Sequence, residues 1–253
     1  MHVAIIIPAR YASSRLPGKP LLAATGKYLI QHVYERACEA RCASEVIVAT
    51  DDERIRDAVA EFGGRAAMTR ADHPSGTDRV AEVAAGLKVD VIVNLQGDEP
   101  MLEAKEIDLL AELLERDPDS AMATLAVPIT EKSVYLSPNV VKVVCDDRGR
   151  ALYFSRSPIP MVRDGEPNFA SRPPRFLQHL GLYAYRREFL LKLAALRPHP
   201  LEEAEKLEQL RVLGTGAAIQ VGLAAHAHRG VDTPADYDAF VRSYAAAGSR
   251  LAA

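Results

Sequence analysis

The stretch VAIIIPARYASSRLPGK, residues 3–19, decides the fold. It begins with an uninterrupted apolar run, Val3 to Ile7, that is rich in β-branched side chains. Neighbouring residues of a strand point to opposite faces of the sheet, so such a run predicts a strand that is covered on both faces. Pro8 ends the run, and a polar loop follows as far as Lys19. A buried strand that leads into a polar loop is typical of an open α/β sheet, which binds ligands at the carboxyl ends of its strands.

Outward from this stretch, short apolar runs alternate with amphipathic segments up to about residue 120. The patterns predict strands at 45–49 and 90–95, and helices at 29–41, 52–62, 77–87 and 104–116. This alternation favours a parallel sheet with helices on both faces.

After residue 120 the pattern changes. Strands are predicted at 121–129 and 217–225, a hairpin at 140–154 around the turn Asp146-Asp147-Arg148-Gly149, helices at 202–212 and 233–244, and a mobile loop at 158–174. We therefore predict an α/β protein with a mixed, mostly parallel sheet and a β-rich subregion.

The composition excludes several classes of protein. Apolar residues make up 48% and charged residues 26% of the 253 residues, as in ordinary globular proteins. The net charge of −3 shows no basic surplus for a nucleic-acid partner. No stretch approaches the ~20 apolar residues of a membrane span, and the N-terminal apolar run is too short for a signal peptide. We expect a cytoplasmic protein with no membrane partner.

The loop after the first strand contains the first candidate site. Arg10, Arg15 and Lys19 lie close together in the sequence, and Gly18 eases a close approach of the backbone. Guanidinium and ammonium groups suit phosphate oxygens, so the loop favours a polyphosphate ligand. The alternative is a solvated basic loop. The loop matches neither GxxxxGK[ST] nor GxGxxG.

Two aspartates are candidate metal ligands. Asp98 follows the strand predicted at 90–95, and Asp232 precedes the helix predicted at 233–244. Mg²⁺ prefers one or two carboxylates together with phosphates and water. Each aspartate also has a structural alternative, an Asx turn for Asp98 and a helix N-cap for Asp232.

The stretch from Ser75 to Arg79, SGTDR, opens a predicted helix. Backbone N–H groups at a helix start can bind a base or a phosphate. The alternative is a capping motif at Thr77.

Ten motifs occur in one order between about residues 3 and 240: PARYASSRLPGKPL, ATDD, MTRADHPSGTDR, VNLQGDEP, ATLAVPI, NVVKVV, ALYFSRSPIP, HLGLYAYR, LEQLRVL and GVDTP. Together they closely resemble the 3-deoxy-manno-octulosonate (Kdo) cytidylyltransferases, also called CMP-Kdo synthetases. RLPGKP alone would identify only the wider cytidylyltransferase group. The resemblance implies a Rossmann-like nucleotide-diphosphosugar transferase fold. It implies a single domain over residues 1–253, with a nucleotide-binding half at 1–120 and a sugar-binding and dimerisation half at 121–253.

The resemblance also implies an activity: transfer of CMP from CTP to Kdo, with release of pyrophosphate, by a Mg²⁺-dependent homodimer in lipopolysaccharide biosynthesis. The implied CTP contacts are Pro8, Ala9, Arg10, Arg15, Lys19, Ser75, Gly76 and Arg79. The implied magnesium ligands are Asp98 and Asp232, which form the catalytic set with Arg15 and Lys19. The implied sugar contacts are Gln96, Arg156, His179, Tyr183 and Glu205.

Within the sugar set, we expect Arg156 to hold the Kdo carboxylate, with His179 and Gln96 as donors. The alternative is that Arg156 pairs with Asp146 or Asp147 across the hairpin. The chain departs from the family pattern at Tyr28, Asp78 and Gln178 and in the loop 161–175.

Other functions stay open at this point. One is a cytidylyltransferase for another substrate, such as a neuraminate-like sugar, 8-amino-Kdo or an erythritol phosphate. Another is a non-catalytic nucleotide-binding or sugar-binding module. The presence of both Asp98 and Asp232 argues against the second.

Overall fold

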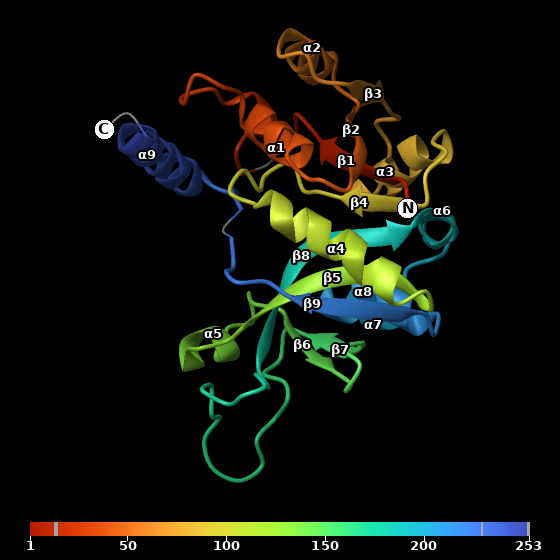
Figure 1. The fold of residues 1–253 in the computed structure, drawn as a ribbon, viewed down its shortest axis with the longest axis vertical. Coiled ribbons are helices and arrows are strands. Elements are labelled where there is room, and N and C mark those ends of the chain that lie inside the picture. Colours follow the sequence, from red (N-terminus) through yellow and green to blue (C-terminus); the bar gives the residue numbers. More distant parts are fainter. Residues whose placement is uncertain (13–14, 229, 252–253) are drawn as a thin grey trace. The chain divides into compact units, whose positions relative to one another are not determined.

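The computed structural model describes residues 1–12, 15–228 and 230–251, so Ser13 and Ser14 of the predicted loop lie outside it (Figure 1). The chain divides into two compact units, described here in turn. The terminal unit consists of His2–Asp108 and the chain from His228 onward. The central unit consists of Leu109–Ala227 together with Met1. The residues after 227 thus rejoin the unit in which the chain starts.

The terminal unit is built on parallel strands in the order β3-β2-β1-β4 (Figure 1). Their bounds are Val3–Ala9 for β1, Ala43–Thr50 for β2, Ala66–Met68 for β3 and Val91–Asn94 for β4. β1 lies between β2 and β4, and its Ile5 is opposite both Val46 and Val93. Each residue from Val3 to Ile7 is at most 1% exposed, so β1 is covered on both faces, as predicted.

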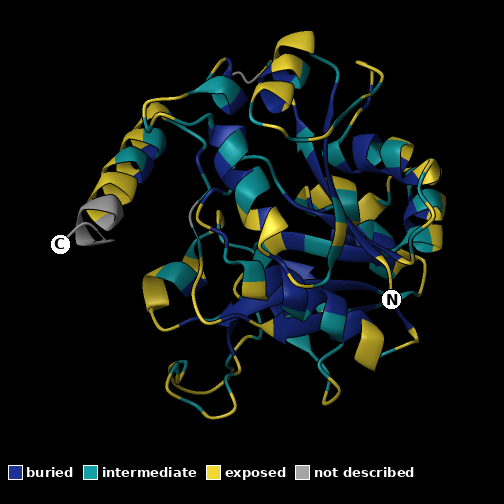
Figure 2. Cartoon of the chain, turned by 45° about the horizontal axis from the view of Figure 1, so that its top comes forward, coloured by how far each residue is buried: buried dark blue, intermediate teal, exposed yellow. Residues whose placement is uncertain are grey.

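Helices connect these strands and follow the last of them. Their bounds are Lys19–Leu21 for the 3₁₀ helix η1, Leu29–Cys38 for α1, Glu53–Glu61 for α2, Gly76–Ala85 for α3, Ala104–Arg116 for α4 and Pro234–Leu251 for α9. α9 packs against α1 through Phe240 and Leu29. The ring of His32 meets those of Phe240 and Tyr244 edge-on. Figure 2 shows the strands buried, whereas the helix that ends at C has exposed residues along most of its length.

The central unit contains a mixed sheet. Its strands are Ser120–Pro128 (β5), Lys142–Cys145 (β6), Ala151–Ser155 (β7), Leu177–Arg186 (β8) and Ala218–Leu223 (β9). β5 pairs with β8 antiparallel and with β9 parallel. β6 pairs antiparallel with β7, which confirms the predicted hairpin, and with β8. The predicted α/β class, with a mixed, mostly parallel set of strands and a β-rich subregion, is confirmed.

The helices of the central unit include one correction. Their bounds are Lys132–Leu136 (α5), Arg187–Ala194 (α6), Pro200–Glu205 (α7) and Gln209–Gly214 (α8). The prediction of one helix at 202–212 is wrong, because Lys206 has a left-handed backbone with φ 55° and separates α7 from α8. In the described part of the chain, no helix is long and apolar enough to cross a membrane.

The predicted loop at 158–174 contains no helix or strand. It contacts α5 at several points. The Phe169 ring packs edge-on against Tyr135, the Tyr135 hydroxyl donates to the Pro160 carbonyl oxygen at 2.8 Å, and Lys132 pairs with Glu166 at 2.6 Å. These contacts give the loop a defined path; its mobility stays a prediction.

Candidate active site

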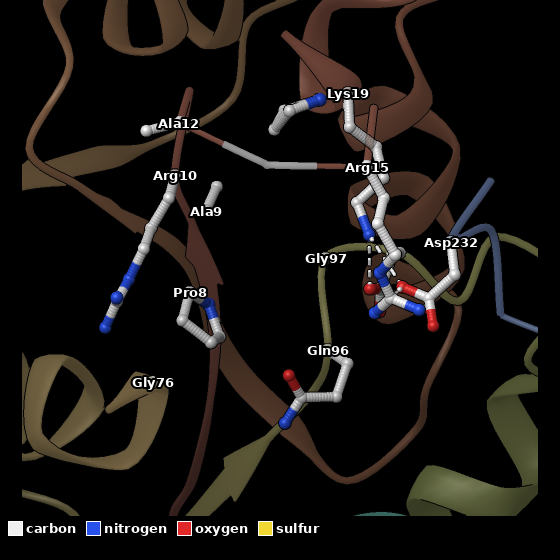
Figure 3. Close-up of a pocket in the computed structure, with 12 residues that line it drawn as sticks. Pro8, Ala9, Arg10, Ala12, Arg15, Lys19, Gly76, Gln96, Gly97 and Asp232 are labelled. Carbon is white, nitrogen blue, oxygen red and sulfur yellow. Dashed lines mark hydrogen bonds and ion pairs between the residues drawn. The ribbon is translucent and has the colours of Figure 1, made fainter. Parts of the chain in front are cut away.

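A cavity of about 380 Å³ lies in the terminal unit where β1 and β4 end (Figure 3). Its lining comes from the end of β1, the loop after it, η1, the start of α3, the segment after β4 and the segment before α9: Pro8, Ala9, Arg10, Ala12, Arg15, Lys19, Pro20, Gly76, Gln96, Gly97, Asp98 and Asp232. Figure 3 shows Lys19, Arg15 and Asp232 on one side and Arg10 on the other. The structure therefore brings together most of the residues predicted to bind a nucleotide and a metal.

Two glycines allow these segments to approach one another. Gly18 has φ 66°, which favours glycine, and its N–H donates to the Tyr11 carbonyl oxygen at 3.1 Å. Lys19 follows it as the first residue of η1. A Cβ on Gly97 would lie 2.9 Å from the Pro8 carbonyl oxygen. The segment that carries Asp98 can pass so close to β1 only because residue 97 has no side chain.

The Lys19 ammonium lies between the two aspartates predicted to hold a metal. Its Nζ is 2.6 Å from Asp98 Oδ2 and 3.4 Å from Asp232 Oδ1. The Arg15 guanidinium contacts the same Asp232 oxygen at 3.3 Å. Both carboxylates therefore face one positively charged position, although they are 134 positions apart (232 − 98).

The structure decides against the alternative role of Asp232 as a helix cap. Thr233 caps α9 instead: its Oγ1 accepts from the Asp236 N–H at 3.2 Å, and Asp236 Oδ2 accepts from the Thr233 N–H at 2.9 Å. This reciprocal pair is a capping box. Asp232 is thus left to face the cavity.

The Asp98 carboxylate contacts the Lys19 ammonium rather than closing the turn that follows β4. In that turn the Glu99 N–H donates to the Gln96 carbonyl oxygen at 3.3 Å. The alternative of an Asx turn at Asp98 is therefore wrong.

Only one residue at the start of α3 lines the cavity. Gly76 lines it, and Arg10 reaches the preceding loop through a hydrogen bond from NH2 to the His73 carbonyl oxygen at 3.1 Å. The N-cap is Ser75, not Thr77, because Ser75 Oγ accepts from the Asp78 N–H at 3.1 Å. Ser75 is absent from the lining, so its contact with a nucleotide stays a prediction.

Arg79 is absent from the lining of the cavity and is 0% exposed. Its NH1 contacts Asp51 at 3.2 Å and also donates to Thr69, the residues that follow β2 and β3. Burial lowers the pKa of Arg79, and Asp51 opposes that shift. In this conformation Arg79 supports strand-end loops, and its contact with a nucleotide stays a prediction.

Two of the predicted sugar residues of the central unit, Arg156 and Glu205, contact each other. Arg156 Nε donates to the Glu205 carbonyl oxygen at 2.8 Å, and its NH1 to the Pro138 carbonyl oxygen at 3.2 Å. Glu205 in turn accepts from the Arg156 N–H at 2.9 Å and from Ser155 Oγ at 2.6 Å. Both Glu205 oxygens are thus engaged by the chain itself, so a contact with a sugar hydroxyl would have to share them.

The suggested pairing of Arg156 with the hairpin acids Asp146 or Asp147 is wrong, because its guanidinium donates to the carbonyl oxygens of Glu205 and Pro138 instead. Asp146 Oδ1 accepts from the N–H groups of Arg148 and Arg150 within the turn. Among the described residues, Arg156 NH2 has no hydrogen-bond partner, which leaves one edge of the guanidinium for a ligand.

His179 is buried, and its role as a donor needs correction. Its Nε2 lies 2.9 Å from Thr124 Oγ1, and the Thr124 hydroxyl has the carbonyl oxygen of Leu182 within 2.8 Å. Because the hydroxyl has one proton to give to a carbonyl, it accepts from an Nε2–H of His179. Nδ1 is then an acceptor, suited to a sugar hydroxyl but not to a carboxylate.

Tyr183 and Gln209 lie beside this histidine. The Tyr183 ring packs against that of His179, and its hydroxyl donates to Gln209 Oε1 at 3.3 Å. Gln209 is 2% exposed, and its Nε2 is buried without a hydrogen-bond partner. An unpaired buried donor of this kind is costly unless a ligand accepts from it.

Comparison with known proteins identifies the family. A cytidylyltransferase family model matches residues 4–219. The 3-deoxy-manno-octulosonate cytidylyltransferase of Syntrophobacter fumaroxidans is 54% identical over 244 residues, covering 95% of this chain and 96% of its own. The chain belongs to the 3-deoxy-manno-octulosonate cytidylyltransferase family.

Solved structures agree with this family. That of a CMP:2-keto-3-deoxy-manno-octonic acid synthetase complexed with CTP superposes with a TM-score of 0.90 at 47% identity, covering 97% of this chain and 99% of its own. A 4-diphosphocytidyl-2C-methyl-D-erythritol synthase from Anaerococcus prevotii has a TM-score of 0.60 at 12% identity, covering 96% and 97%. The second likeness shows a shared fold alone.

The donor set of this cytidylyltransferase-family chain fits magnesium. Asp98 and Asp232 already converge on one ammonium group. The described residues contain no group of three or more His, Cys, Asp or Glu side chains that could hold a metal ion. Two carboxylates suit Mg²⁺, which completes its coordination with phosphates and water, but are too few for a structural zinc site.

Lys142 contacts the Arg156 backbone and was missed by the sequence reasoning. It is 0% exposed, and its ammonium donates to the carbonyl oxygens of Ser137, Val140 and Arg156 at 2.8, 2.6 and 2.5 Å. It therefore links the Arg156 backbone to the segment that supplies the Pro138 carbonyl. A lysine inside the apolar motif NVVKVV was the available signal.

The burial of His179 has a consequence for acid stability. Burial lowers the pKa of His179 to about 3, whereas an unfolded histidine has a pKa of about 6.5. Between these values the unfolded chain binds a proton that the folded chain does not. This residue should therefore lower the free energy of unfolding by about 1.4 kcal/mol per pH unit as the pH falls below about 6.5.

Urea unfolding of His179→Gln and the wild type between about pH 7 and pH 4 tests this expectation. The variant should lose stability less steeply as the pH falls. Equal slopes would show that His179 is not buried in the neutral form.

Proposed function

We propose that this chain transfers CMP from CTP to the anomeric hydroxyl of Kdo and releases pyrophosphate. The observation that carries the proposal is the cavity in which the Lys19 ammonium contacts both Asp98 and Asp232, with Arg15 on the same side and Arg10 across from them. The 54% identical relative and the CTP-bound structure at 47% identity support it.

The cations of the loop after β1 suit a triphosphate. Arg10 and Arg15 offer forked donors, Lys19 offers a compact charge, and Gly76, the first residue of α3, lines the cavity. CTP would place its phosphates among these groups.

In the reaction, the sugar hydroxyl attacks the α-phosphorus of CTP. A bond forms between that phosphorus and the sugar oxygen, the bond from the α-phosphorus to the oxygen that bridges it to the β-phosphate breaks, and the hydroxyl releases its proton to water. Pyrophosphate leaves with the bonding electrons, and Arg15 and Lys19 stabilise its charge. Transfers of this kind depend mainly on positioning and charge neutralisation. Asp98 and Asp232 would hold Mg²⁺, which when bound neutralises phosphate charge and lowers the pKa of a coordinated hydroxyl.

For the acid sugar, Arg156 is the proposed carboxylate partner. The Nδ1 acceptor of neutral His179 and the unpaired Nε2 donor of Gln209 suit hydroxyl groups. Gln96, which lines the cavity, Tyr183 and Glu205 complete the proposed set. We also propose that the chain acts as a homodimer in the cytoplasm.

Pyrophosphate release with CTP and Mg²⁺ tests the function directly. The panel of acceptors should contain Kdo, 8-amino-Kdo and a neuraminate, and the panel of nucleotides CTP, ATP and GTP. We expect release with CTP and Kdo, and much less with the purine nucleotides or the neuraminate. Preference for another acid sugar would keep the reaction type and change the substrate. If none of the acceptors gave pyrophosphate release, a non-catalytic binding module would be favoured.

Arg156→Lys tests the carboxylate contact. A lysine keeps the charge but cannot replace the two-pronged guanidinium, so the loss should be about 1.5–3 kcal/mol, the range for a charged hydrogen bond. It should fall on kcat/KM for Kdo, with the dissociation constant of CTP unchanged. Kinetics with the two substrates varied separately measure this.

Arg150→Lys provides the matched control, because Arg150 in the same unit forms a forked pair with Asp117 at 2.8 and 2.7 Å. It should leave the Kdo dependence unaltered. If Arg156→Lys did the same, Arg156 would not hold the carboxylate.

A further inference from the structure

A histidine–glutamate pair lies at the other end of the short segment that leads to Asp232. His228 Nε2 is 2.9 Å from Glu106 Oε2, and the two side chains are only 14% and 4% exposed. At this distance the two side chains form an ion pair when the imidazole is protonated. Glu106 raises the pKa of His228, which favours the charged imidazolium.

Glu106 is itself fixed by the start of α4. Its Oε2 also accepts from the Glu103 N–H at 3.1 Å, and its own N–H donates to the Glu103 carbonyl oxygen at 2.9 Å. A carboxylate held in this way gives His228 a stationary partner.

Beyond His228, the segment is attached again shortly before Asp232. The Val231 N–H donates to the Asp98 carbonyl oxygen at 2.8 Å, and the Val231 side chain is 2% exposed in a cluster with Leu29 and Phe240. One proposed metal ligand is thus bound through its backbone to the neighbour of the other. The pair of His228 with Glu106 is a second anchor on the approach to Asp232, and the Asp232 N–H itself donates to Asp236 Oδ2 at 3.3 Å.

We infer that His228 and Glu106 are positioning residues, which form a clasp that holds Asp232 beside Asp98 and so sets the affinity of the cation site. This inference rests on the proposed function, because that function makes Asp232 a metal ligand. The physical reason is pre-organisation: two carboxylates bind a cation more tightly when the chain already holds them together.

The test compares Glu106→Gln and His228→Gln with Asp108→Asn. Asp108 lies on the same helix, is also buried, and forms its own ion pair with Arg41 at 3.1 Å, but it contacts Arg41 and Cys42 rather than the segment before Asp232. The control therefore reproduces the loss of a buried carboxylate on α4 without opening the clasp.

Two measurements are needed on the full chain. Mn²⁺ binding in the presence of CTP, followed by electron paramagnetic resonance, should weaken about tenfold in Glu106→Gln and in His228→Gln, no further in the double variant, and not at all in Asp108→Asn. Exchange of the Val231 amide hydrogen should speed up in the first two variants only.

The clasp would be overturned if Glu106→Gln and His228→Gln matched Asp108→Asn in both measurements. His228 lies nearer the surface, so its variant decides the question even where Glu106→Gln does not fold. If the wild type bound no Mn²⁺, the metal assignment of the proposed function would fail, while the Val231 amide would still decide whether the clasp exists.

Discussion

Asp98→Asn and Asp232→Asn should each lower the turnover number by about 10³-fold, on the scale of losing a major electrostatic stabiliser. Asparagine keeps the size of the side chain but removes the charge that faces the shared cation position. Both side chains are partly exposed, at 30% and 48%, so the free energy of unfolding should change little. Turnover at saturating CTP, Kdo and Mg²⁺ measures the effect.

Asp90→Asn is a suitable control. Asp90 directly precedes β4, at the end opposite Asp98, and its carboxylate accepts from the His2 N–H at 2.7 Å. Its turnover should match the wild type. Near-wild-type turnover in Asp98→Asn or Asp232→Asn would remove that residue from the metal site.

Lys19→Ala should lower turnover by about 10²-fold or more and weaken CTP binding, with the KM for Kdo little changed. The variant loses a cation for the leaving pyrophosphate. It also leaves Asp98 and Asp232 facing each other without the ammonium between them. Its melting temperature should therefore fall without Mg²⁺ and rise more than that of the wild type when Mg²⁺ is added, because a ligand of the folded state stabilises it.

Lys27→Ala is the matched control, since Lys27 pairs with Glu35 at the same 2.6 Å distance but outside the cavity. It should show neither effect. If Lys19→Ala changed only the KM for Kdo, the loop after β1 would contact the sugar rather than the triphosphate.

Much of the terminal unit could be predicted from its sequence because its strands are short apolar runs. The run Val3–Ile7 is buried on both faces, and the pattern identifies such strands directly. β8, Leu177–Arg186, was missed because buried and partly exposed residues mix along it and Gly181 interrupts it. The break between α7 and α8 was also missed, because a single left-handed residue, Lys206, leaves no mark on helical spacing.

The candidate site could likewise be predicted only in part. The motif resemblance identified Asp98, Asp232 and Lys19, and the structure places all three on one cavity. No spacing rule could bring Asp232 there, because the chain returns to the terminal unit only after the whole central unit.

The tautomer of His179 could not be predicted from the sequence either, because it depends on a hydrogen bond to Thr124, which is 55 positions away. The occupied oxygens of Glu205 depend on Ser155 and Arg156 in the same way. Sequence motifs identify which side chains are present, whereas their neighbours determine which of their atoms are still available.

The discontinuity of the terminal unit sets an order of assembly. Residues 109–227 leave the ribosome before Asp232 does, so the central unit can fold while the cavity still lacks one wall. The hydrogen bond from the Val231 N–H to the Asp98 carbonyl oxygen closes a loop of more than a hundred residues. Contacts between residues so far apart in the sequence form slowly. During synthesis the chain therefore contains the basic loop after β1 long before it contains both Asp98 and Asp232. The proposed cation site is therefore complete only once residue 232 has been synthesised and has joined the ends of β1 and β4.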